Sequence, residues 1–367
     1  MAAALLAAAG LAPPPPPAAA VLNSPNARIP RSVDAALRRA IPAFNQDVRA
    51  VQGRLEDIAF QLRIPQRKPW QAMADNVAAA AASVAQRDKA LYGVPEEQRA
   101  TAEGLVTAIA DGLRSVNAAI DARDADKVSV RAGAVLRNVA ELELLQAPGL
   151  PFSVPRDLAC LPLLTGRAVV ELTIERSDGS LAFLPYDGSG PSAVARLQLV
   201  LDGYSAPVTA GNFAANVRAG VYNGVPLNAS YASVLAGGGR AQGRAVPLEI
   251  LPAGDFDPLY RTQVDVGAGE LPALPLSIFG ALAMAHLPHD AGPELDGYMA
   301  ADEFFIYKFS REQAGLSGLA FDEGQFGVFG YVTAGAEMVP QLLSGDVITS
   351  ARLVSGDNHL VLHEGQC

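Results

Sequence analysis

The fold of the C-terminal half is decided by one stretch, Asp202-Gly203-Tyr204-Ser205-Ala206-Pro207-Val208-Thr209-Ala210-Gly211-Asn212-Phe213. Thr209 belongs to a residue type that caps helices through its side-chain oxygen. Phe213 and Val217 lie four residues apart, so they share one face of a helix. Gly220 is suited to end that helix, because glycine adopts the left-handed backbone conformation at little cost. The stretch therefore predicts a short helix that begins near Thr209 and ends at Gly220.

Strands are predicted on the N-terminal side of this helix. In residues 170–175, Val170, Leu172 and Ile174 alternate with polar residues, and residues 197–201 repeat the alternation with leucines. Such a period of two indicates a strand that is buried on one face. Asp178-Gly179 provides a turn between the two strands. A strand pair, a helix and many further short strands favour a β-barrel closed by helices.

Four motifs then make a family resemblance specific. The stretch 206–213 resembles the Ala-Pro-x-Thr-x-x-Asn-Phe helix start of cyclophilins. Residues 280–285 resemble the family's Gly-x-x-x-Met-Ala strand, residues 303–306 its Gln-Phe-Phe-Ile strand, and residues 328–332 its Val-Phe-Gly-x-Val strand. All four occur in the family's order. The resemblance implies a cyclophilin-like closed β-barrel with capping helices over residues 166–367, and peptidyl-prolyl cis-trans isomerisation as the family's activity.

The first half of the chain has a helical period. Apolar residues recur at spacings of three and four in four segments between residues 32 and 145, and the connections between them are short. This pattern predicts an antiparallel helical bundle over residues 30–147, followed by a proline-rich linker over residues 148–165. The bundle contains no histidine, so a metal core is not indicated. Arg38 and Arg39 are predicted to lie on a solvated face.

Composition excludes several classes of function. The formal net charge is −10 and the isoelectric point is about 4.9, which disfavours nucleic acid as a partner. No run of apolar residues is long enough to predict a membrane-spanning helix. Neither a metal nor a cofactor is predicted: His286, His289 and Asp290 lie in a loop, and His359 and His363 lie near the C-terminus. Cys160 and Cys367 form no zinc motif, and whether they pair with each other is left open.

Residues 1–20 are rich in alanine and proline. They resemble the apolar region and small-residue cleavage site of a secretory signal, but a disordered leader or a misassigned start codon explains them equally well. The whole chain resembles the multidomain cyclophilins of the chloroplast thylakoid lumen, in which a helical bundle precedes a divergent cyclophilin domain. Residues 22–26, 64–69, 142–147 and 321–326 fit one lumenal subgroup. The resemblance implies the chloroplast thylakoid lumen as the location and favours a targeting signal in residues 1–20.

The resemblance also indicates damage to the catalytic strand. The family's Phe-x-Arg strand falls at residues 227–238, where Asn228 or Ala229 takes the arginine position, depending on a one-residue register. Ser233 falls at the position of the phenylalanine in the proline socket, and Ala236 at the position of a glutamine. No catalytic residue is therefore predicted. Arg240 and Arg244 lie beyond the glycine run and would supply a cation only if that loop folded back.

The other wall of the family's peptide pocket is better retained. The resemblance implies six candidate peptide-binding residues, which come from the strands and loops after residue 280: Ala285, His286, Glu303, Phe305, Phe321 and Phe326. Ala285 and Phe305 match family residues, whereas His286 replaces an asparagine and Glu303 a glutamine. For each aromatic residue, a place in the barrel core is an alternative interpretation.

Three functions remain open. The first is a peptide-binding folding or assembly factor in the thylakoid lumen that is weak or inactive as an isomerase. The second is an active prolyl isomerase, and the third is a structural lumen protein whose groove is occluded. The expected partners are peptide or protein clients, for which subunits of photosynthetic complexes are candidates, together with an intramolecular contact between bundle and barrel.

Overall fold

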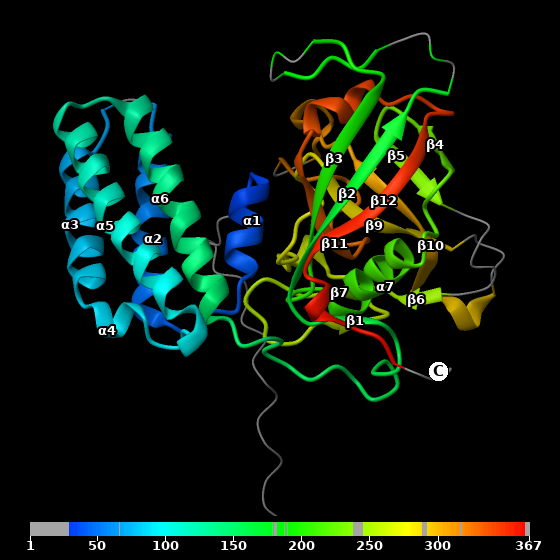
Figure 1. Cartoon of the computed structure of the whole chain (residues 1–367), viewed down its shortest axis with the longest axis horizontal. Helices are drawn as coiled ribbons and strands as arrows, with labels where there is room; N and C mark the ends of the chain where they lie inside the picture. The colour runs from blue at the N-terminus through cyan, green and yellow to red at the C-terminus, as the bar shows by residue number, and fades with distance from the viewer. Residues whose placement is uncertain are drawn as a thin grey trace, which may run out of the picture.

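The computed structural model describes residues 29–363, except residues 66, 178, 180–181, 187, 189, 238–244, 288–291 and 316–317. A helical part and a β-rich part follow each other along the chain (Figure 1). The predicted leader, residues 1–20, lies outside the described residues, and so do Arg240, Arg244 and Cys367, whose pairing with Cys160 was left open. In the described part, no helix is both long and apolar enough to cross a membrane.

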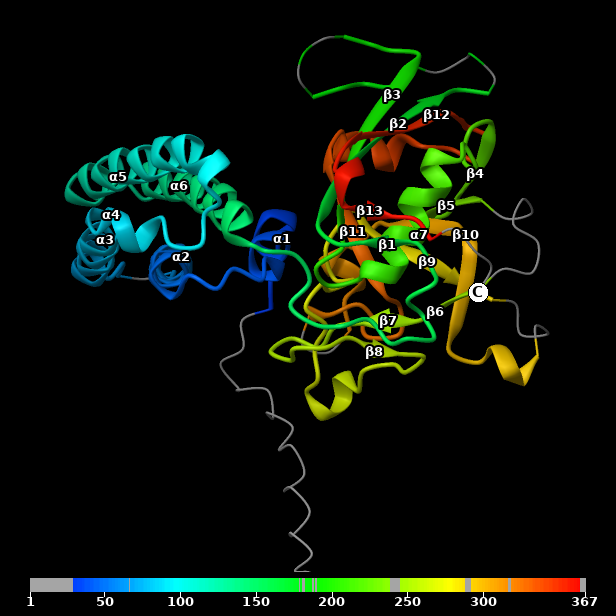
Figure 2. The ribbon, with the colours of Figure 1, turned by 60° about the horizontal axis from the view of Figure 1, so that its bottom comes forward.

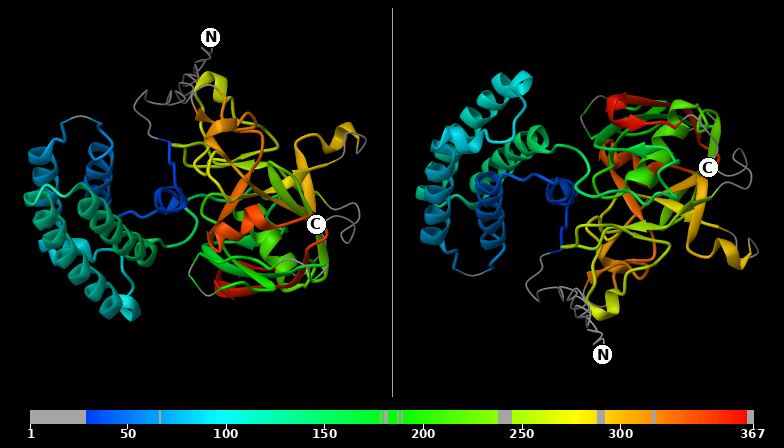
Figure 3. Two further views of the ribbon diagram at one scale, coloured as in Figure 1. Left: turned by 90° about the horizontal axis from the view of Figure 1, so that it is seen from above. Right: turned by 90° about the horizontal axis from the view of Figure 1, so that it is seen from below.

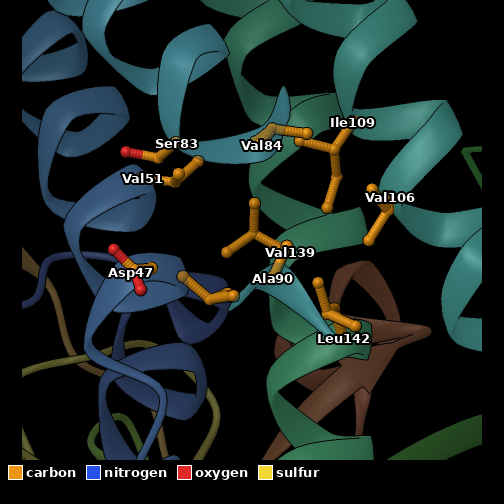
Figure 4. A pocket seen from close by; sticks show the side chains of 10 residues that line it. Asp47, Val51, Ser83, Val84, Ala90, Val106, Ile109, Val139 and Leu142 are labelled. Carbon is orange, nitrogen blue, oxygen red and sulfur yellow. The ribbon is translucent and has the colours of Figure 1, made fainter. Parts of the chain in front are cut away.

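The helical part contains an antiparallel bundle. Its helices are α2 (Gln46–Gln61), α3 (Trp70–Ala85), α5 (Arg99–Asp121) and α6 (Ala125–Gln146), with the short α4 (Arg87–Ala90) between α3 and α5. Apolar residues at helical spacing bury one face of each long helix in a common core. Figure 4 shows the apolar side chains around a gap in this core, whose volume is only ≈ 10 Å³. A space of that size holds at most one water molecule, so this gap is no ligand site.

Helix α1 (Val33–Ala40) lies between the bundle and the barrel (Figures 2 and 3). Its buried residues Ala36 and Leu37 belong to an apolar cluster that is otherwise made of barrel residues. The prediction that Arg38 and Arg39 lie on a solvated face was wrong. Both guanidinium groups donate hydrogen bonds to the carboxylate of Glu56 on α2, and Arg38 is buried. These ion pairs join α1 to the bundle while its apolar face contacts the barrel.

The β-rich part is a closed barrel. Eight antiparallel strands form the ring β5-β4-β12-β2-β3-β11-β9-β10, and β10 pairs with β5 to close it. The strands of the ring are β2 (Arg167–Glu175), β3 (Val194–Asp202), β4 (Val225–Ala229), β5 (Ser233–Gly237), β9 (Ala281–His286), β10 (Tyr298–Tyr307), β11 (Val328–Ala334) and β12 (Val347–Ser355). In the described part of the chain, five short strands lie outside it: β1 (Leu163–Leu164), β6 (Ala245–Pro247), β7 (Glu249–Ile250), β8 (Leu259–Tyr260) and β13 (Leu360–Val361). The fold is thus the predicted α + β chain, a helical region followed by a closed barrel.

Alternation in the sequence explains the barrel interior. Along β2 and β3 every second residue is buried, as the apolar period predicted. These side chains belong to the same core as three aromatic rings, those of Phe213, Phe304 and Phe329. The ring centroid of Phe213 is 4.9 Å from that of Phe304 and 5.0 Å from that of Phe329. Aromatic rings at such distances stabilise one another beyond their burial. The interior of the ring is therefore filled by side chains.

Helix α7 (Pro207–Arg218) closes one end of the barrel, as residues 202–213 predicted. The predicted cap was wrong, because Thr209 lies inside the first turn rather than before it. The carboxylate of Glu249 replaces it: its oxygens accept hydrogen bonds from the backbone N–H groups of Val208 and Thr209, at 3.2 and 2.8 Å. A residue 40 positions away in the sequence caps the helix, which no local pattern indicates. Gly220 follows the last turn with φ +71°, as predicted.

Candidate functional site

The outer face of the barrel carries an apolar patch in the region where the sequence predicts the retained wall of a peptide pocket. Phe305 on β10 lies directly opposite Ala283 on β9 and opposite Leu235 on β5, and Val328 on β11 lies opposite Ala283. Residues that oppose each other across strands project to the same side of a sheet. These four apolar residues therefore form one continuous patch, which belongs to the same apolar cluster as Ala36 and Leu37 of α1.

An aromatic cluster lies on this patch. The ring of Phe326 is 5.0 Å from that of Phe305, at 82°, and 4.3 Å from that of His286. Tyr307 extends the cluster, with its ring 6.4 Å from that of Phe305. Three predicted residues, His286, Phe305 and Phe326, are thus brought together from two strands and a loop. The cluster has an exposed side, because His286 is exposed whereas Phe305 retains only 8% of its surface.

Phe321 and Ala285, the other two apolar candidates, precede Phe326 and His286 in the sequence. The side chain of Phe321 is 78% exposed, so it is not part of the barrel core. It lies against Gly315, since a Cβ atom there would be 3.2 Å from the Phe321 ring. Ala285 precedes His286 at the end of β9 and is half-buried. The structure therefore places Phe321 on a surface loop and Ala285 beside the aromatic cluster.

Glu303 lies on the same strand face as Phe305, two residues earlier, and is half-buried. Burial raises the pKa of its carboxyl group, and the charge of the neighbouring Asp302 raises it further. Its partner on β5 is Gly237, whose φ of +112° is in the left-handed region. A Cβ atom on Gly237 would lie 1.9 Å from the carbonyl oxygen of Asp302, so only glycine fits here.

The loop before β11 is fixed by a buried carboxylate. Glu323 accepts hydrogen bonds from the backbone N–H groups of Leu276 and Ser277, both at 2.8 Å, and from the hydroxyl of Ser277. That hydroxyl also accepts a hydrogen bond from the backbone of Ala320 at 2.7 Å. Burial raises the pKa of Glu323. Glu323 thus holds the segment that leads to Phe326, and it acts as a positioning residue for the aromatic cluster.

The neighbouring part of the sheet, formed by β4 and β5 and called the β4–β5 wall here, has a different character. Asn228 lies opposite Leu235, and Ala229 lies opposite Val234. The backbone N–H of Ala229 donates a hydrogen bond to the hydroxyl of Ser344 at 2.9 Å, and this hydroxyl contacts the amide oxygen of Asn228 at 3.3 Å. No residue of β4 or β5 is cationic. Whichever register holds, these two strands present no charged donor to a bound peptide.

Of the other two degenerate positions, Ala236 does not face the patch, whereas Ser233 lies opposite Tyr307 and on the same strand face as Leu235. Ser233 closes the turn between β4 and β5, where its carbonyl oxygen accepts a hydrogen bond from the hydroxyl of Ser230. Ala236 lies opposite Phe304 and is buried in the barrel interior. Leu235 projects to the patch instead. Sequence reasoning missed Leu235, Ala283 and Val328; the period-two alternation of residues 233–237 around a buried Val234 was the available signal.

Among the described residues, this face offers apolar area, and β4 and β5 place no cationic side chain beside it. Rotation about an X-Pro bond faces a barrier of about 20 kcal/mol because the planar amide is resonance-stabilised. Catalysis requires a donor that binds the twisted amide better than the planar one. Asn228 is neutral, so the described residues of the β4–β5 wall offer at most a weak donor.

Comparisons with known proteins agree with this architecture. Residues 32–145 match the family model for the PsbQ-like domain of peptidyl-prolyl cis-trans isomerase CYP38-like proteins. Residues 192–358 match the model for cyclophilin-type peptidyl-prolyl cis-trans isomerases. The helical first half and the barrel therefore each correspond to a recognised domain.

Similar proteins match the chain across both domains. The chain is 45% identical over 348 residues to the chloroplastic peptidyl-prolyl cis-trans isomerase CYP37 of Arabidopsis thaliana, covering 93% of this chain and 73% of that protein. It is 35% identical to a putative thylakoid lumen peptidyl-prolyl cis-trans isomerase of Synechocystis, covering 89% of this chain and 83% of that protein. The predicted location, the chloroplast thylakoid lumen, is confirmed by these relatives. The chain belongs to the cyclophilin-type peptidyl-prolyl cis-trans isomerase family, with a PsbQ-like helical domain before its cyclophilin domain.

Proposed function

We propose that the chain is a peptide-binding folding or assembly factor of the thylakoid lumen, with weak or no isomerase activity. One observation carries this proposal: the aromatic cluster of His286, Phe305 and Phe326 is assembled, while β4 and β5 contain no cation opposite it. Binding of apolar segments requires the first feature, and turnover requires a donor that the second wall does not provide. The proposed clients are lumenal proteins, among them subunits of photosynthetic complexes.

Isomerisation of an X-Pro peptide tests the proposal. The full chain is compared with a cyclophilin that retains the Phe-x-Arg strand, at equal concentration, and peptide binding is measured in parallel by fluorescence anisotropy. We expect binding of a labelled X-Pro peptide together with a rate at least about 100-fold below that of the reference, the effect typical of one lost preorganised donor. A rate equal to that of the reference would contradict the proposal.

An active isomerase is the second candidate function. It is favoured by the relatives, since proteins 45% and 35% identical to this chain bear the name of peptidyl-prolyl cis-trans isomerases. Activity would then depend on a donor outside β4 and β5. The same assay separates the two candidates, because it measures rate and binding on one sample.

A structural protein with an occluded groove is the third candidate. It is favoured by α1, because Ala36 and Leu37 occupy the same apolar cluster as Phe305 and Val328. Substitution Leu37→Ser weakens that contact without adding a charge. If α1 occludes the groove, L37S binds the labelled peptide more tightly than the unsubstituted chain does; if the groove is open, the two bind alike.

A further inference from the structure

Two further pockets share the residue Phe279, and one of them is lined by Ser230 and Tyr231 of the turn between β4 and β5. The first, which we call the hairpin pocket, has a volume of ≈ 530 Å³. Phe279, Pro340, Leu342 and Leu343 form its apolar walls, and Tyr231, which is 78% exposed, stands at its rim. The volume is that of an ordinary ligand pocket and is ample for an apolar side chain.

Among the residues that the structure describes, the hairpin pocket contains a cation with no carboxylate partner. The ammonium group of Lys308 donates one hydrogen bond, to the carbonyl oxygen of Ser230 at 2.9 Å. An ammonium group has three donors, so two remain for a ligand. Partial burial lowers the pKa of Lys308, because the charged form is less well solvated there. The residues that line the pocket include no carboxylate.

The second pocket, which we call the arginine pocket, has a volume of ≈ 290 Å³. It forms where the segment before α1 meets the barrel, and Arg31 and Arg311 line it together with the apolar Ile278 and Leu319. Within the described residues neither arginine forms an ion pair, and no carboxylate lines this pocket either. Two guanidinium groups at one small apolar hollow favour an anionic ligand.

Phe279 lines both pockets, so they form one surface. We call it the basic surface and define it by Phe279 together with Lys308, Arg311 and Arg31. The surface contrasts with the rest of the molecule, since the whole chain carries a formal net charge of −10. Because successive residues of an extended chain advance by about 3.5 Å, a segment of a few residues reaches from one pocket to the other.

We propose that the basic surface binds an extended acidic segment of a partner polypeptide. Apolar side chains of that segment enter the two pockets on either side of Phe279, and its carboxylates pair with Lys308, Arg311 and Arg31. The choice of an acidic partner rests on charge complementarity. The three cations have no carboxylate partner among the described residues, and they line two partly apolar pockets on an acidic protein. A polypeptide satisfies both features, because one chain can carry both apolar and acidic side chains.

Binding of a synthetic peptide to the full chain tests the proposal. The probe is fluorescein-labelled Leu-Glu-Leu-Glu-Leu, amidated at its C-terminus, and the reference probe has glutamine in place of both glutamates. We expect the acidic probe to bind at least about tenfold more tightly than the glutamine probe, with an affinity that falls as salt is added. The double variant Lys308→Gln with Arg311→Gln is expected to lose about tenfold in affinity, the loss typical of removing charged hydrogen-bond donors.

A matched control carries the same change in net charge elsewhere. Lys89 and Arg63 are exposed cations of the helical part, and the double variant Lys89→Gln with Arg63→Gln is expected to bind the acidic probe within about twofold of the unsubstituted chain. Equal losses in both double variants would show unspecific attraction and overturn the proposal. So would absence of binding at about 1 mM probe, or equal binding of the glutamine probe.

Two further measurements keep the result decisive. Amide chemical shifts of the unsubstituted chain locate the probe without any substitution: we expect changes at Leu343 and Leu319 and none at His286. Changes confined to His286 would assign the acidic probe to the aromatic cluster and overturn the proposal. The second measurement is sedimentation with anionic lipid vesicles. If the vesicles bind in a manner that depends on Lys308 and Arg311, and the acidic probe does not bind, the ligand of the basic surface is a membrane and the proposal is overturned.

Discussion

The two walls of the peptide face differ in what their residues provide. The β9–β10–β11 wall contributes Ala283, Phe305 and Val328, and it supports the rings of Phe326 and His286. The β4–β5 wall contributes Leu235 and two neutral residues, Asn228 and Ala229, which are the candidates for the place where the family has an arginine. Apolar area supplies binding regardless of the bond being twisted, whereas a charged donor supplies catalysis. One wall can therefore be kept while the other changes its chemistry.

Substitution Gly237→Ala is expected to have the largest effect, because it separates the two walls. A Cβ atom at 1.9 Å from the carbonyl oxygen of Asp302 forces β5 away from β10, and φ is +112°. We expect a loss of about 4 kcal/mol in the free energy of unfolding, measured by urea denaturation. Gly133→Ala on α6 is the control: nothing lies within 4 Å of its Cβ, so a gain of about 0.5–1 kcal/mol is expected. Equal stability of G237A and the unsubstituted chain would contradict the described closure.

Introducing an arginine tests the proposal that the β4–β5 wall limits catalysis. Variants Asn228→Arg and Ala229→Arg cover the two registers, and the one that places its guanidinium over the bound prolyl nitrogen is expected to gain about 100-fold in kcat/KM. The measurement is isomerisation of an X-Pro peptide. Gln198→Arg, an exposed position on β3, is the matched control and should leave the rate unchanged. If the unsubstituted chain already turns over as fast as both variants, the β4–β5 wall is not the cause.

Substitution Phe305→Leu tests the other wall. It removes the ring that contacts both Phe326 and Tyr307, so we expect peptide binding to weaken about tenfold and the free energy of unfolding to fall by about 1 kcal/mol. Phe304→Leu is the control, because the neighbouring ring points into the barrel and contacts Phe213. It should cost a similar amount of stability and leave binding, measured by anisotropy, within about twofold. The reverse pattern would place the binding face elsewhere.

Features set by short-range patterns were predictable from the sequence. The alternation of β2 and β3 and the helical period of the bundle reflect which side of each element is buried, and the structure has both. The aromatic residues His286, Phe305 and Phe326 were found through their motif positions. Their mutual contacts follow from strand register, which the closed barrel fixes.

Features that depend on distant partners were not predictable. Thr209 carries a capping side chain, yet Glu249 caps α7, because the barrel brings the two together. Arg38 and Arg39 are adjacent cations in the sequence, and only the structure shows that both form ion pairs with Glu56. The place of Ala236 also depends on strand pairing: one residue of register moves a side chain from the outside of a sheet to the inside, and Ala236 lies in the barrel interior.

The smallest expected effect concerns pH and the retained wall. Burial and the charge of Asp302 raise the pKa of Glu303, so between its ordinary value of 4.5 and the raised value the folded chain holds more protons than the unfolded chain. Stability therefore falls as pH rises through that window. Glu303→Gln removes this pH dependence. The free energy of unfolding of the variant, relative to that of the unsubstituted chain, should therefore be about 0.5 kcal/mol higher at about pH 7.5 than at about pH 4. The effect is small because the carboxyl group is partly solvated. Urea denaturation at both pH values measures it, with the exposed Glu312→Gln as control. An identical pH difference in E303Q and the unsubstituted chain would mean that Glu303 is solvated like any surface carboxylate, and that the retained wall is more open to water than its burial indicates.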